Sequence, residues 1–111
     1  MSVQGVLAQA TVRDLTRAEA WYETVFGAPP GARPMNGLLE WHFGAGFGVQ
    51  VWAEPDRAGH STVVLSETDL DGLSARLTRA GIEHPGPQPG GGQRVLQVFD
   101  PDGNRLVFTG A

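Results

Sequence analysis

The side chains best suited to chemistry in this chain are Glu40 and His42, which stand two residues apart in an alternating stretch. Residues spaced by two point to the same side of a strand, with Cβ atoms about 6–7 Å apart. A carboxylate beside an imidazole can act as a general base with its orienting partner. The simpler interpretation is a solvated strand edge with two polar side chains.

Strand alternation predicts that other polar and aromatic side chains share the face of this pair. Trp52 would be a stacking platform for a planar ligand, although core filling or a dimer contact would explain it equally well. Three glutamines on this face need hydrogen-bond partners, which a polar ligand could supply. The predicted ligand-binding set is Gln9, Glu40, His42, Gln50, Trp52, Thr62, Gln97, Phe99 and Val107.

The opposite parity of the same strands is almost wholly apolar, which supports this assignment of faces. We expect helices to cover it. Its members are Val6, Ala8, Ala10, Val12, Leu39, Trp41, Phe43, Val49, Val51, Val63, Leu65, Leu96, Val98, Leu106 and Phe108.

In the first half, residues 3–13 alternate as a half-buried strand, and a helical period follows. The run from Thr16 to Glu19 fits a capping box with Thr16 as the N-cap, and Gly27 is placed to end the helix. Two strands are predicted after a Pro/Gly break, at about residues 36–43 and 47–53.

The second half repeats this order about 55 residues later, which indicates one structural unit used twice. Thr68 or Asp69 is expected to cap its helix, and Gly81 to end it. Residues 84–93 are so rich in Gly and Pro that a mobile loop with short extended pieces is predicted. A hairpin over Asp100–Asn104 closes the chain. The sequence therefore predicts an α+β domain spanning 1–111, with βαβββ repeats 3–53 and 61–110 and a linker 54–60.

Composition excludes several classes of protein. The 111 residues suit one domain, and the chain has no cysteine for a disulfide or thiolate site. The net charge is −4 and the arginines are scattered, which argues against a nucleic-acid surface. No signal peptide or membrane span is apparent, so we expect a cytoplasmic protein that contacts neither nucleic acid nor membrane.

Asp14-Leu15, Ala20-Trp21-Tyr22 and Phe26-Gly27, followed by Asp100-Pro101-Asp102-Gly103-Asn104 before the last strand, resemble the vicinal oxygen chelate superfamily. This group includes glyoxalase I, extradiol dioxygenases and bleomycin-resistance proteins. The resemblance covers essentially the whole chain. It implies an open, U-shaped mixed sheet around a ligand cleft, with one helix per unit on the outer face.

The resemblance also implies where metal-binding members carry their His, Gln or Glu ligands. The matching positions here are Leu7, Gln50, Thr62 and Val107. Leucine and valine have no lone pair to donate, and threonine is a poor ligand for a transition ion. His60, two residues from Thr62, is the alternative ligand there, but it is better explained as an exposed linker residue. We therefore expect no metal and no cofactor.

The leading hypothesis is a metal-free protein that binds a small organic molecule, as in drug or natural-product sequestration. One alternative is a metal-independent isomerase, cyclase or lyase that uses Glu40 and His42 as an acid–base pair. Another is a metal-dependent lyase or dioxygenase with atypical ligands. A homodimer is expected because an open sheet leaves strand edges uncovered. The sequence names no ligand and leaves open whether the halves pair within one chain or between chains.

Overall fold

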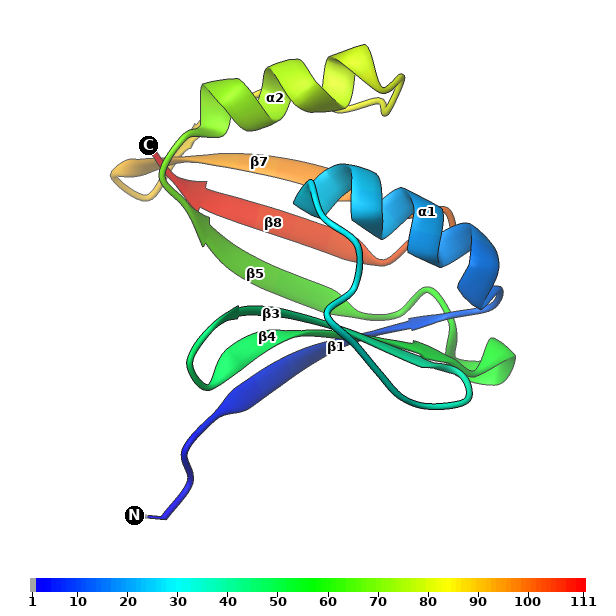
Figure 1. The fold of residues 1–111 in the computed structure, drawn as a ribbon. Helices are drawn as coiled ribbons and strands as arrows, with labels where there is room; N and C mark the ends of the chain where they lie inside the picture. Colours follow the sequence, from blue (N-terminus) through cyan, green and yellow to red (C-terminus); the bar gives the residue numbers. More distant parts are fainter. Residues whose placement is uncertain (1) are drawn as a thin grey trace.

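The computed structural model describes residues 2–111, and residue 1, the first of the predicted domain, lies outside the described part. Figure 1 shows how its helices and sheets are arranged. The first half contains β1 (Val6–Val12), α1 (Leu15–Phe26), β2 (Ala32–Met35), β3 (Leu38–Gly44) and β4 (Phe47–Ala53). A 3-10 turn, η1 (Pro55–Arg57), leads to β5 (Thr62–Glu67), α2 (Leu70–Arg79), β6 (Gln88–Gly90), β7 (Gln93–Phe99) and β8 (Arg105–Gly110).

The strands form two four-stranded mixed sheets, ordered β1-β4-β3-β2 and β5-β8-β7-β6. In each sheet the first strand pairs in parallel with the last strand of its unit, and the remaining pairs are antiparallel. This is the predicted α+β fold of two βαβββ units, which is confirmed. No residue range was predicted for the short strands β2 and β6, which contain Pro34 and Pro89.

Helix α1 begins two residues earlier than the capping box predicted. Asp14 is the N-cap, and its carboxylate accepts hydrogen bonds from the backbone N–H groups of Thr16 and Arg17 at 3.0 and 3.3 Å. The prediction that Thr16 caps the helix was therefore wrong. Glu19 instead pairs with Arg33 of β2, and this hydrogen bond lowers the pKa of the Glu19 carboxyl. Gly27 ends the helix with φ of 78°, a left-handed conformation that suits glycine.

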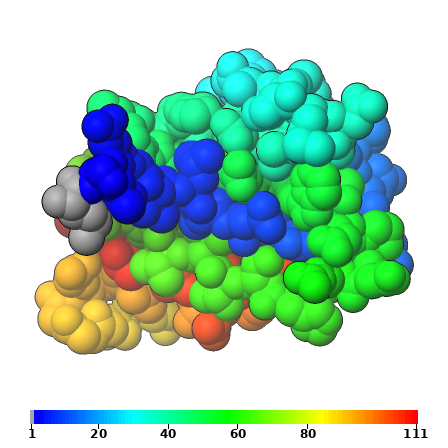
Figure 2. Space-filling model, turned by 90° about the horizontal axis from the view of Figure 1, so that it is seen from below, coloured from blue at the N-terminus to red at the C-terminus, as the bar shows by residue number. Residues whose placement is uncertain are grey.

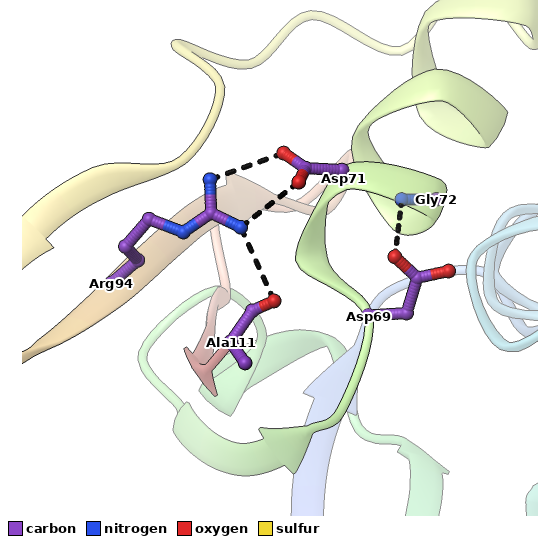
Figure 3. A network of polar contacts seen from close by, with 5 residues as sticks. All are labelled: Asp69, Asp71, Gly72, Arg94 and Ala111. Carbon is purple, nitrogen blue, oxygen red and sulfur yellow. Dashed lines mark hydrogen bonds and ion pairs between the residues drawn. The ribbon is translucent and has the colours of Figure 1, made fainter.

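Helix α2 is capped by Asp69, one of the two predicted residues, which accepts a hydrogen bond from the Gly72 N–H at 2.9 Å. Figure 3 shows how the first turn of α2 is tied to β7 and the chain end. Arg94 donates to both carboxylate oxygens of Asp71 at 3.1 Å and to the carbonyl of Ala111 at 3.2 Å. These contacts with Arg94 lower the pKa of Asp71. Because the pair is exposed, it orients the helix more than it stabilises the fold.

Both helices lie on the same side of the paired sheets (Figure 1), and one core joins both halves. The predicted apolar parity is largely buried there, including Leu39, Trp41, Val51, Leu96 and Leu106. Two predicted members are exposed instead: Val6 is 70% and Phe43 is 43% accessible. Neither helix among residues 2–111 is long and apolar enough to span a membrane.

The Asp100–Asn104 segment forms the predicted turn between β7 and β8, but it also joins the two halves. The side chain of Asn104, which is fully buried, donates to the carbonyl of Thr11 at 2.7 Å and accepts from the N–H of Ser61 at 2.8 Å. Asp100 accepts from the hydroxyl of Tyr22 at 2.7 Å. These contacts tie β1 and α1 to the start of β5. Interpreting the segment as a tight turn alone therefore missed its larger role.

Candidate functional site

The polar face of the first sheet is organised by strand register. Gln9 of β1 lies opposite Gln50 of β4, which lies opposite Glu40 of β3. All three side chains therefore stand in one row across neighbouring strands, on the side away from the buried Ala10, Val51 and Leu39 of the intervening positions. The sequence predicted the common face, and the structure adds the alignment.

Hydrogen bonds connect this row into a chain. Gln9 donates from its amide to the Gln50 side-chain oxygen at 3.2 Å, and Gln50 donates to Glu40 Oε2 at 2.7 Å. The other oxygen, Glu40 Oε1, lies 2.9 Å from His42 Nε2. The Glu40 side chain is only 12% exposed, whereas that of His42 is 50% exposed. We call Gln9, Gln50, Glu40 and His42 the polar row.

This geometry leaves an accessible imidazole held by a largely enclosed carboxylate. Such an arrangement can bind a ligand through hydrogen bonds, and it can also support proton transfer at His42. Trp52 lies beside the row, opposite Thr11 on one strand and Leu38 on the other. Its ring is half-buried, and its indole N–H donates to Glu54 at 3.2 Å. Part of the ring therefore remains available for contact with another molecule.

The remaining predicted residues lie on the second sheet. Thr62 pairs with Arg105, which pairs with Phe99, and Val64 pairs with Val107, which pairs with Gln97. Phe99 is 59% exposed and Val64 is 65% exposed. Figure 2 views the molecule from below, on the side away from the helices, and shows β1 (blue) crossing the middle of this side. The predicted set therefore falls into two groups, one on each sheet.

Two cavities lie elsewhere in the part of the chain that the structure describes. One, of about 520 Å³, opens between β1 and β5 on the helix-covered side. Another, of about 250 Å³, lies at the β2–β3 turn between Met35 and Leu39. No member of the predicted ligand-binding set lines either cavity. Strand parity alone could not locate the first cavity, because it forms where the two sheets diverge.

The family's metal positions are divided between the two sheets. Leu7 and Gln50 lie on the first sheet, whereas Thr62 and Val107 lie on the second. Leucine and valine have no donor atom, so the residues present do not fit a transition ion. Across residues 2–111, no group of three or more His, Cys, Asp or Glu side chains is arranged to hold a metal. His60 is exposed.

Solved structures similar to this one share nearly the whole chain. A glyoxalase/bleomycin resistance protein from Catenulispora acidiphila DSM 44928 is 28% identical, with a TM-score of 0.88 and coverage of 97% of this chain and 98% of that one. TnmS3, an antibiotic binding protein from Streptomyces sp. CB03234, is 24% identical, with a TM-score of 0.78 and coverage of 99% and 98%. A bleomycin-binding protein complexed with bleomycin is 20% identical, with a TM-score of 0.80 and coverage of 96% and 97%.

The search of curated proteins found no match. The family model named Glyoxalase/Bleomycin resistance protein/Dioxygenase superfamily matches residues 28–108, well over half of the chain. This match includes β3 and β4, which carry Glu40, His42 and Gln50, and it includes the Asp100–Asn104 turn. The chain therefore belongs to the glyoxalase/bleomycin resistance protein/dioxygenase superfamily.

Proposed function

We propose that this protein sequesters a small, largely planar organic molecule on the sheet face that carries the polar row, without metal and without turnover. The observation that carries the proposal is the hydrogen-bonded row from Gln9 to His42 beside the half-buried Trp52. A few fixed polar groups next to an aromatic surface are typical of small-molecule sites. Antibiotic binding by TnmS3 and by the bleomycin-binding protein is in keeping with it.

The proposal includes a homodimer. Thr62, Gln97, Phe99 and Val107 lie on a different sheet from the polar row, and both groups face away from the helices. A second copy that places its second sheet opposite the polar row would bring the two groups onto facing walls. The exposed Phe99 would then be covered. We expect light scattering to give a dimer at tens of micromolar protein, and a monomer under these conditions would contradict this part of the proposal. A cytoplasmic location also stays a prediction.

Binding can be tested with a thermal-shift screen of planar natural products that includes bleomycin, followed by calorimetry on the hits. We expect Trp52→Ala to weaken binding about tenfold, which corresponds to roughly 1.4 kcal/mol, with little change in thermal stability. Trp21→Ala is the matched control, because Trp21 lies on α1 at the other side of the molecule. Equal losses of affinity in both variants, or stabilisation by no compound in the screen, would contradict the proposal.

One observation favours a second candidate function, metal-independent acid–base catalysis. The contact of 2.9 Å between Glu40 Oε1 and His42 Nε2 would orient an accessible imidazole, as a general base requires. An isomerase, cyclase or lyase could use that pair. A metal-dependent lyase or dioxygenase has no comparable support, since Leu7 and Val107 occupy ligand positions.

A further inference from the structure

The cavity of about 520 Å³ lies where the two halves separate. β1 and β5 are the edge strands of their sheets, and they approach each other at the Thr11–Ser61 contact. Toward the other ends of these strands, Val6 and Ala8 of β1 and the run Val63–Glu67 of β5 line the cavity. Its volume is within the range of about 300–1,000 Å³ that is usual for small-molecule sites.

The walls of the cavity are mostly apolar, and one of them is aromatic. Phe26 of α1 and Phe43 of β3 meet edge to face with ring centroids 5.0 Å apart, and Phe47 also lines the cavity. Several large apolar side chains of the lining are exposed, namely Val6, Phe43, Phe47 and Val64. Large exposed apolar side chains gathered around a cavity are typical of a site that binds a ligand or a partner.

Arg76 of α2 brings a positive charge to this apolar space. Its Nη2 donates to the carbonyl of Val25, near the end of α1, at 2.6 Å. Its Nε is buried and finds no acceptor among residues 2–111. A guanidinium has five N–H donors, and a buried donor without a partner costs free energy. The cavity lining therefore includes a guanidinium with at least one N–H group that no acceptor in the described part of the protein uses.

The acidic residue of the lining, Glu67, uses one carboxylate oxygen at the start of α2. It accepts a hydrogen bond from the backbone N–H of Asp69 at 3.1 Å, at the start of α2. In the part of the chain that the structure describes, the ion pairs of arginine involve Arg33, Arg57 and Arg94, so Arg76 has no carboxylate partner. A carboxylate can take two parallel N–H donors from a guanidinium, which makes it the natural partner.

We propose that this cavity is a second binding site, which takes an apolar molecule bearing a carboxylate. The apolar body would pack between the phenylalanine wall and β5, and the carboxylate would pair with Arg76. The site is separate from the polar row, so the two can be tested independently.

Nuclear magnetic resonance with decanoate and decanol as probes tests this proposal, because the two differ only at the head group. We expect decanoate to shift the Arg76 Nε–H resonance and the Val63–Glu67 amides saturably, and decanol to bind at least fivefold more weakly. Arg76→Met should abolish the preference for decanoate. Arg79→Met is the matched control, since Arg79 is an exposed arginine of the same helix outside the cavity lining, and it should change nothing.

Arg76 also helps to end α1, so Arg76→Met could unfold the protein. If its spectrum loses dispersion, Ala8→Leu decides instead, because it narrows the cavity without changing charge and should weaken decanoate binding at least fivefold. Equal affinity for both probes, or an unchanged preference in folded Arg76→Met, would overturn the proposal. So would shifts confined to Gln9, Gln50 and Trp52, which would favour the polar row. Absence of binding, together with loss of a dimer in Phe47→Asp, would overturn it by showing that a second copy covers the cavity.

Discussion

Glu40 connects the polar row, because its two carboxylate oxygens contact different neighbours. One lies against His42 and the other accepts from Gln50, and the side chain is largely enclosed. Its position on the same face as His42 followed from spacing in the sequence. Its contact with Gln50 depends on the register between β3 and β4, which no residue pattern specified. The sequence therefore predicted which side chains share this face better than it predicted the contacts among them.

Substitution of His42 separates binding from catalysis. If the row only binds ligand, His42→Gln keeps a polar side chain of similar reach, and affinity should change by about tenfold or less. If the pair moves protons, turnover should fall by roughly two to four decades while affinity holds. We expect the first result by calorimetry. A substrate that the unaltered protein converts, and that both His42→Gln and Glu40→Gln bind without converting, would contradict it.

Tyr22, the one tyrosine of the chain, provides a pH-dependent test of the core. Burial raises the pKa of Tyr22 above its ordinary value of about 10, and the neighbouring Asp100 raises it further. The folded protein therefore keeps the proton to higher pH than the unfolded chain does. Stability should be unaffected by this group below about pH 10 and should fall above it by about 1.4 kcal/mol per pH unit.

Tyrosinate absorbance should accordingly appear only as the protein unfolds. Denaturant titrations at several alkaline pH values measure the slope, and Tyr22→Phe should remove this contribution. Tyrosinate formation near the ordinary pKa in the folded protein would contradict the assignment.

The helices show which local signals can be ambiguous. Asp14 and Thr16 are both favourable N-cap residues, and each precedes a helical pattern. Asp14 caps α1 because its carboxylate reaches two free N–H groups, while Glu19 is held by Arg33. Preference tables rank such residues but cannot choose between neighbours, so the start of a helix is harder to predict than its existence.

A pair of alanine substitutions checks this assignment. Asp14→Ala should lower the free energy of unfolding by about 1 kcal/mol, because two N–H groups at the start of α1 lose their acceptor. Thr16→Ala, the matched control, should change it by less than about 0.5 kcal/mol. Urea denaturation measures both. The reverse order of effects would restore Thr16 as the cap.

The strands were predicted well where their alternation continues into a covered core. Leu39, Trp41 and Val51 are all buried, as period-two patterning required. The prediction that Val6 and Phe43 are buried was wrong. A strand rises about twice as far per residue as a helix does, so a strand can extend past the end of the helix that covers it. The apolar cavity lies at the start of β1, beside the exposed Val6.

At the scale of the whole molecule, Asn104 joins the two units. Its side chain contacts the first half at Thr11 and the second half at Ser61, and it also donates to Asp100 at 2.8 Å. The sequence identified this segment as characteristic of the family but indicated only a turn. The connection across the molecule depends on packing between residues far apart in the chain, which local patterns do not specify.

Asn104→Ala should therefore destabilise the protein by about 3 kcal/mol, because it leaves several buried polar groups without partners. Asp102→Ala is the control from the same turn. It removes the acceptor of the exposed backbone N–H of Arg13, which lies 3.2 Å from Asp102 Oδ2. Its cost should be less than about 1 kcal/mol. Thermal and urea unfolding measure both losses. Similar losses in the two variants would contradict the larger contribution assigned to Asn104.

In the described part of the chain, the strands of each half pair only with one another, so the chain can be cut between the halves without breaking a sheet. Within residues 2–111, every strand ladder stays inside one half, and β1 and β5 are unpaired along their adjoining edges. The core, however, is shared by both helices and both sheets. Cleavage in the η1 segment would thus interrupt no ladder, while each fragment would expose its part of the core. Such fragments should be unfolded alone and should restore the fold on mixing, which would make this protein a natural scaffold for a complementation reporter.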